Sequence, residues 1–181
     1  YSETPGLRLL VAAPRELRPE LLRLIRRETE HARAGRHGRI EAKMNALVDP
    51  EVIAALYEAS QAGVEIDLTV RGICCLQPGI SGLSDNITVR SIVGRFLEHA
   101  RIFHFHNAGE SETYLSSADW MPRNLDRRIE LMFPVLDPDV RRNVMDILRL
   151  QQQDTAKAWL LDKTTWTPRR DEANAGRINS Q

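Results

Sequence analysis

The sequence has few cysteines and no long apolar run, and both absences narrow the class of protein. Its 181 residues include only two cysteines, Cys74 and Cys75, which are adjacent and therefore poorly placed to bond to each other. Thiols without disulfide partners indicate a reducing compartment, so we expect a cytoplasmic protein. No apolar stretch approaches the roughly 18 residues of a membrane helix, so we expect no membrane span.

The N-terminal stretch lacks a basic leader and an initiating methionine. The residues YSETPGLRLLVAAPREL contain one brief apolar run, which does not match a secretory signal peptide. The missing methionine indicates a segment of a longer chain.

An excess of charge of one sign is also absent, since 25 Lys and Arg balance 25 Asp and Glu. This balance argues against a surface devoted to nucleic acid, and we expect no nucleic-acid partner. It still allows a local basic pocket, because most of the positive charge is arginine, whose forked guanidinium suits phosphate oxygens. The hydrophobic share of 42% suffices for one domain with a core.

The first 70 residues alternate between strand and helix patterns. The clearest helix follows Asp49, a suitable N-cap, with Pro50 at the first helical position and Gly63 at the end. The predicted order is strand 7–14, helix 15–35, strand 38–45, helix 50–63 and strand 64–70. Such alternation is typical of a mostly parallel α/β sheet, whose sites gather at the carboxyl ends of strands, where Arg71 lies.

The second part of the chain has a looser pattern. Residues 71–86 hold three glycines and a proline, which predicts a long loop. The remaining predicted elements are strands from residue 87 and at 101–106, 113–120, 127–135 and 156–161, with a helix after Asp137. From residue 162 the chain turns polar, and we expect a frayed tail.

Three histidines fall within eight residues: His99, His104 and His106. His104 and His106 alternate with two phenylalanines, so they share a strand face that points away from a Phe-lined core. A zinc site needs several converging ligands, and we expect an ordinary polar face at these two positions. His99 differs because Arg101 follows two residues later, and an imidazole beside fixed positive charge suits phosphoryl transfer.

The residues around His99 resemble the pattern of the phospholipase D superfamily. His99 with Arg101, SSAD at 116–119 and RNLDRRIE at 123–130 are similar to its His, its basic residue, its Ser-x-Asn turn and its Asn-x-Glu. Arg101 stands where Lys is usual, Asp119 where Asn is usual, and Arg128 where Asn precedes the Glu. These departures weigh against a phosphodiesterase.

A closer resemblance covers residues 7–161. The blocks RGICCL, FLEHARI and SADWMPRNLDRR resemble the last domain of the polyphosphate kinase family, bacterial enzymes with a pair of phospholipase D-like C-terminal domains. The family usually has Arg where this chain has Gln77. The resemblance implies an α/β fold, with a mixed, mostly parallel sheet flanked by helices, over residues 1–161, followed by a polar tail over 162–181.

For this family, the resemblance implies reversible transfer of the terminal phosphate of ATP to inorganic polyphosphate through a phosphohistidine. Arg71 is similar to the arginine that grips ATP phosphates, and His99 to the second active-site histidine. The phosphorylated histidine, the Mg²⁺ ligands and an adenine-stacking aromatic residue belong to the preceding domain, so we expect this chain to be inactive alone. The implied ligands and partners are ATP or ADP, Mg²⁺ held outside this chain, inorganic polyphosphate, the rest of the parent chain and further copies in a homo-oligomer. A peripheral membrane association of the parent stays open.

Two other interpretations remain: a phospholipase D-type phosphodiesterase built from two His99 half-sites, and a non-catalytic module that binds polyanions or mediates assembly. Several weaker site candidates accompany His99 and Arg71. They are Lys43 and Asn45 on the second strand, Ser117 and Asp119 as residues that orient His99, and Arg123, Arg127 and Arg128 as a positive field for a polyanion.

Overall fold

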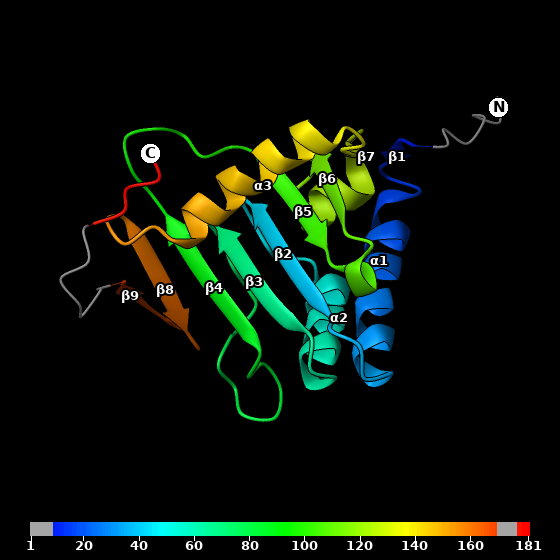
Figure 1. The fold of residues 1–181 in the computed structure, drawn as a ribbon, viewed down its shortest axis with the longest axis horizontal. Coiled ribbons are helices and arrows are strands. Elements are labelled where there is room, and N and C mark those ends of the chain that lie inside the picture. Colours follow the sequence, from blue (N-terminus) through cyan, green and yellow to red (C-terminus); the bar gives the residue numbers. More distant parts are fainter. Residues whose placement is uncertain (1–8, 170–176) are drawn as a thin grey trace.

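The computed structural model describes residues 9–169 and 177–181. They form one mixed sheet with α1 and α2 on one face and α3 across the other (Figure 1). The strands lie in the order β1-β7-β6-β5-β2-β3-β4-β8-β9. Their bounds are β1 Val11–Ala12, β2 Arg39–Met44, β3 Glu65–Val70, β4 Ile87–Ile92, β5 Arg101–Phe105, β6 Glu112–Ser116, β7 Leu131–Pro134, β8 Ala158–Asp162 and β9 Thr165–Pro168. The helices are α1 Leu17–Arg33, α2 Pro50–Gln61 and α3 Pro138–Gln152, with short helical turns at Asn107–Gly109 and Arg123–Arg127.

The mixed sheet flanked by helices is confirmed, but the expectation of mostly parallel pairing is wrong. Only β2–β3 and β3–β4 pair in parallel, and the other neighbours in the described sheet are antiparallel. The reason is connection length, because parallel neighbours need a crossover such as α2, whereas short links such as the one between β5 and β6 allow only antiparallel pairs. The antiparallel β5 brings its first residues beside the carboxyl end of β2.

The helix that was predicted most clearly from sequence has the expected start. The Asp49 side chain accepts hydrogen bonds from the backbone N–H groups of Glu51 and Val52, and Pro50 occupies the first helical position of α2. The carboxylate satisfies two amides that would otherwise lack partners at the helix start. The cap fixes where α2 begins.

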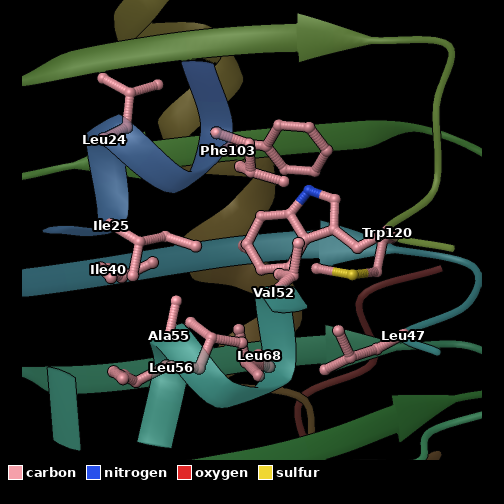
Figure 2. Close-up of a cluster of buried hydrophobic side chains, with 14 of the residues drawn as sticks. Leu24, Ile25, Ile40, Leu47, Val52, Ala55, Leu56, Leu68, Phe103 and Trp120 are labelled. Atoms are coloured by element: carbon pink, nitrogen blue, oxygen red, sulfur yellow. The ribbon is translucent and has the colours of Figure 1, made fainter. Parts of the chain in front are cut away.

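The main core lies between the sheet and the helices α1 and α2. Trp120 is fully buried there against Phe103, with ring centroids 4.9 Å apart, and Ile25 and Val52 approach it from the two helices (Figure 2). The predicted alternation on β5 is confirmed, since Phe103 and its neighbouring Phe105 are both fully buried in this core. The intervening side chains therefore point to the α3 face.

The expectation of a frayed tail from residue 162 is wrong for the described residues. Thr165–Pro168 form β9, which pairs with β8, and the predicted boundary at residue 161 falls within β8. Further along, the carbonyl of Ile178 accepts hydrogen bonds from the backbone of Thr155 and Ala156. A polar segment can still complete a sheet because strand pairing uses backbone groups. Residues 170–176 of the predicted tail lie outside the described residues. In the described residues, each helix is too short or too polar to span a membrane.

Candidate active site

Three cationic side chains gather where β2 and β3 end and β5 begins. Lys43 lies near the end of β2, Arg71 directly follows β3, and Arg101 opens β5, whose next residue pairs with Lys43. Burial lowers the pKa of the Lys43 ammonium, and the positive charges of Arg71 and Arg101 lower it further against the attraction of Glu98. The sheet therefore collects positive charge at the edge where α/β folds usually hold ligands.

The Lys43 side chain is buried rather than open to a cleft. It is 2% exposed, and its Nζ donates to the carbonyl of Ala100 at 3.1 Å and lies 3.5 Å from Glu98. Lys43, a weaker site candidate from the sequence, is therefore not placed to contact a ligand directly, because its ammonium holds the segment that carries His99.

Arg101 and Asp119 form a forked pair beside His99. Arg101 Nε and Nη2 donate to the two oxygens of Asp119 at 3.1 and 3.0 Å. Asp119 is itself buried and accepts from the backbone N–H of Asn45 at 2.7 Å, which ties the end of β2 to the segment after β6. Two parallel charge-assisted hydrogen bonds hold the guanidinium in one orientation.

The remaining nitrogen of Arg101 reaches His99. Arg101 Nη1 lies 3.2 Å from His99 Nδ1 and donates to the His99 carbonyl at 3.0 Å. A guanidinium can only donate, so Nδ1 must accept, and the neutral imidazole then carries its proton on Nε2. The His99 side chain is exposed, and its Nε2–H is the group it can offer to a ligand. Asp119 thus orients His99 through Arg101 rather than by direct contact.

Arg71 has no acidic partner among the described residues. Its backbone N–H donates to the carbonyl of Met44, and its carbonyl accepts from Ser91, so the main chain is fixed on both sides. Its Nε is enclosed without a hydrogen-bond partner, and the side chain lines two cavities of about 460 and 330 Å³. A guanidinium that extends from a fixed main chain and has no carboxylate partner in the described residues is available for a phosphate.

Glu98 is the residue of this site that sequence analysis missed. Besides Lys43, its carboxylate accepts hydrogen bonds from Gln151 of α3 at 2.6 Å and from Gln181 at 3.2 Å. Gln181 also donates to the carbonyl of Phe96, so the segment before His99 is tied to two distant parts of the chain. No local pattern signals this, because the partners lie 53 and 83 residues away in sequence.

The other weaker candidates fall in different places. Ser117 donates to Glu130 and does not contact His99 in any hydrogen bond of the described residues. Arg123, Arg127 and Arg128 are exposed around the π-helical turn, as a solvated charge run would be.

The described residues do not fit a metal centre. No group of three or more His, Cys, Asp or Glu side chains converges within them. Near His99, both carboxylates are engaged, Asp119 with Arg101 and Glu98 with Lys43. Burial raises the pKa of the Cys74 thiol to about 11, so this cysteine is a neutral thiol and a poor ligand.

The fold defines the class of protein. The crystal structure of Nuc from Salmonella typhimurium, a phospholipase D family member, matches with a TM-score of 0.56 at 12% identity, over 77% of this chain and 90% of that one. At this identity the likeness shows the fold alone, which is phospholipase D-like.

The sequence comparisons define the family within that class. The pattern of the family described as polyphosphate kinase C-terminal domain 2 matches residues 9–181. The polyphosphate kinase of Rhodopirellula baltica is 53% identical over 176 residues, which are 95% of this chain. The crystal structure of polyphosphate kinase from Porphyromonas gingivalis matches with a TM-score of 0.93 at 43% identity, over 99% of this chain. The chain belongs to the polyphosphate kinase family, as its C-terminal domain 2.

The match covers only a part of each relative. The chain spans 21% of the Rhodopirellula protein and 28% of the Porphyromonas chain. The prediction that the chain is a segment of a longer protein is consistent with both of these coverages.

Proposed function

We propose that this chain is the phosphate-binding half of a phosphoryl-transfer site. Its parent reversibly transfers the terminal phosphate of ATP to inorganic polyphosphate, through a phosphohistidine that lies outside this chain. Arg71 binds the phosphates of ATP or ADP, and His99 hydrogen bonds to the phosphoryl group or to the leaving oxygen. The membership of the polyphosphate kinase family supports this assignment.

The observation that carries the proposal is the unpartnered guanidinium of Arg71. In the described residues, the other buried or half-buried cations of the site have fixed partners, Lys43 with Glu98 and Arg101 with Asp119. Phosphoryl transfer needs positioned positive charge more than covalent chemistry from the protein. Of these three cations, Arg71 is the one whose positive charge is available for a phosphate.

His99 suits the role of a donor in the transfer. With Nδ1 occupied by Arg101, its Nε2–H can donate a hydrogen bond to an oxygen on which negative charge grows as the P–O bond breaks. The reverse transfer uses the same hydrogen bond. Mg²⁺, when bound by residues outside this chain, would neutralise phosphate charge.

The site also has an apolar border that we assign to the rest of the parent chain. Phe96 and Leu97 line the larger cavity at Arg71 and are 60% and 69% exposed. Ile73, two residues after Arg71, is 65% exposed. Such side chains close together favour a protein contact over solvent. We further propose that the parent acts as a homo-oligomer in the cytoplasm, as the family resemblance and the unpaired thiols suggest.

Substitutions in the full-length parent test the two roles. Arg71→Gln is expected to reduce kcat/KM for ATP about 100- to 1,000-fold, as the loss of one aimed charge does. His99→Gln is expected to reduce kcat about 100- to 10,000-fold. The charge-matched control is Arg33→Gln, which removes an exposed arginine of α1 that pairs with Glu58 of α2. Turnover within threefold of wild type for Arg71→Gln or His99→Gln would overturn the assignment and favour a non-catalytic polyanion-binding module.

The isolated chain provides a second test. We expect it to form no ATP from ADP, Mg²⁺ and long-chain polyphosphate, because the phosphorylated histidine is missing. ATP formation would show that the chain carries a complete site. Release of p-nitrophenol from bis-p-nitrophenyl phosphate would instead support the phosphodiesterase alternative.

A further inference from the structure

A second basic hollow lies on the α3 face of the sheet, away from Arg71. It has a volume of about 480 Å³ and lies between α3 and the strands β2 and β5. It shares no lining residue with the two cavities at Arg71. Its strand wall begins at Arg39, four residues and roughly 13 Å along β2 from Lys43. We call this hollow the α3 groove. Its charged and polar lining residues are Arg39, Glu41, His104, His106, Ser111, Arg141, Arg142 and Arg149.

Four arginines line the α3 groove, and two of them have close carboxylate partners, Arg39 with Glu65 at 2.8 Å and Arg142 with Asp139 at 3.0 Å. The other two arginines are weakly neutralised. Arg141 bonds only to the backbone carbonyl of Ser111 and has no carboxylate partner in the described residues. Arg149 lies 3.7 Å from Asp146, an exposed pair one helical turn apart, and such pairs contribute little. On the strand side, Glu41 is the one carboxylate of the wall, and it is bound by Arg39 and by Gln152.

Two histidines contribute polar side chains to the groove wall. Burial lowers the pKa of His104 to about 4, and its Nδ1 is within 2.8 Å of the Thr113 hydroxyl. His106 packs edge-on against His37, and its Nδ1 is enclosed without a hydrogen-bond partner. The groove therefore combines guanidinium charge from α3 with imidazole hydrogen-bonding groups from β5 and from the residue that directly follows it.

We propose that the α3 groove binds a run of phosphoryl groups of an inorganic oligophosphate, as a docking site separate from the transfer site. Arg141 and Arg149 are eight residues apart and so span about 12 Å along α3, a spacing that suits an extended polyanion better than a single phosphate. The lining holds no Phe, Tyr or Trp within the described residues, which disfavours a nucleotide base. The choice of polyphosphate as ligand rests on the proposed function, whereas the anion site rests on the groove itself.

The five histidines of the chain allow a site-resolved binding test. Imidazole resonances of His104 and His106 report on the groove, and those of His99 report on the transfer site. We expect tripolyphosphate to shift the His106 resonances saturably in this chain. The double variant Arg141→Gln/Arg149→Gln should weaken that binding at least tenfold. The matched control is Arg23→Gln/Arg33→Gln, which removes two exposed arginines from α1, and it should bind as wild type does.

Each contrary result has a definite meaning. A response confined to His99, or an equal response to sulfate at matched ionic strength, would overturn the groove as an oligophosphate site. Tighter binding of ATP than of tripolyphosphate at the groove would assign it to a nucleotide and overturn the proposed ligand. Arg71→Gln should leave the His106 response unchanged, so a failure of the proposed function at Arg71 is separable from a failure at the groove.

In the full-length parent the groove predicts an effect on long polyphosphate that ATP does not share. The double variant should raise KM for long polyphosphate at least tenfold while KM for ATP stays within twofold. An equal rise for both substrates would point to a general structural defect and contradict a docking role.

Discussion

The Arg101 side chain connects an exposed imidazole to a buried carboxylate. It uses its whole guanidinium, with two nitrogens on Asp119 and the third on His99. The tautomer of His99 therefore depends on a residue that does not touch the substrate in the proposed reaction. Only a planar, always-charged donor set can make all three contacts, because a lysine has one nitrogen at this position.

Arg101→Lys is expected to release the His99 imidazole. In nitrogen-15 NMR, wild-type His99 should carry its proton on Nε2, whereas the variant should show a mixture of the two neutral tautomers. Arg23→Lys, which alters an exposed fork with Glu20, is the control and should leave His99 unchanged. A wild-type imidazole protonated mainly on Nδ1 would contradict the role assigned to Arg101.

At the scale of elements, two helices start with the same local device in different surroundings. Asp49 before α2 and Asp137 before α3 each accept two backbone N–H bonds, and each is followed by proline. Asp49 is fully buried and pairs with Arg18 at 2.6 Å, whereas Asp137 is exposed. The Asp137 cap therefore stabilises the start of α3 alone. The Asp49 cap stabilises the start of α2 and also connects α2 to α1 through Arg18.

The matched substitutions Asp137→Ala and Asp49→Ala separate these contributions. We expect Asp137→Ala to lower the free energy of unfolding by about 1 kcal/mol, the usual value of an N-cap. Asp49→Ala should lower it by roughly 2–4 kcal/mol, because it also leaves the Arg18 guanidinium short of a buried partner. Urea unfolding of both variants checks the difference, and equal losses would show that the ion pair adds nothing to the cap.

For the whole molecule, one core joins both helices of one face to the central strands, so folding of these parts should be cooperative. The dependence of the folding stability on pH is set in part by His104 on the α3 face. Burial holds the pKa of this imidazole at about 4, below its ordinary value of 6.5. The unfolded chain therefore binds a proton that the folded chain does not between these two values.

The sign of the effect follows from this difference in protonation. The contribution of His104 to stability is fully present above pH 6.5 and is lost as the pH falls toward 4. The free energy of unfolding should fall by up to about 1.4 kcal/mol per pH unit from this group. His104→Gln should flatten the profile in that window, as measured by urea unfolding at a series of pH values. An unchanged slope in the variant would contradict the assigned pKa.

Local sequence signals were sufficient for the starts of two helices, for the buried face of β5 and for the family. Asp-Pro pairs mark the starts of α2 and α3, and the Phe-His alternation predicts which face of β5 is buried. These features depend on residues within one helical turn or one strand, so the pattern contains all the information needed. The positions of Arg71 and His99 in family-specific blocks made them site candidates, and their roles remain proposals.

What the tertiary structure alone decided is which distant residues meet. The direction of β5, the pairing of Arg101 with Asp119, and the contact of Glu98 with Gln151 each depend on the path of the chain. The α3 groove is the clearest case, because Arg39 and Arg141 lie about a hundred residues apart in the sequence. The sequence pattern of β2 gives no information about where α3 packs. Such contacts arise from packing of a helix on a sheet, and periodicity within either element cannot encode the register between them.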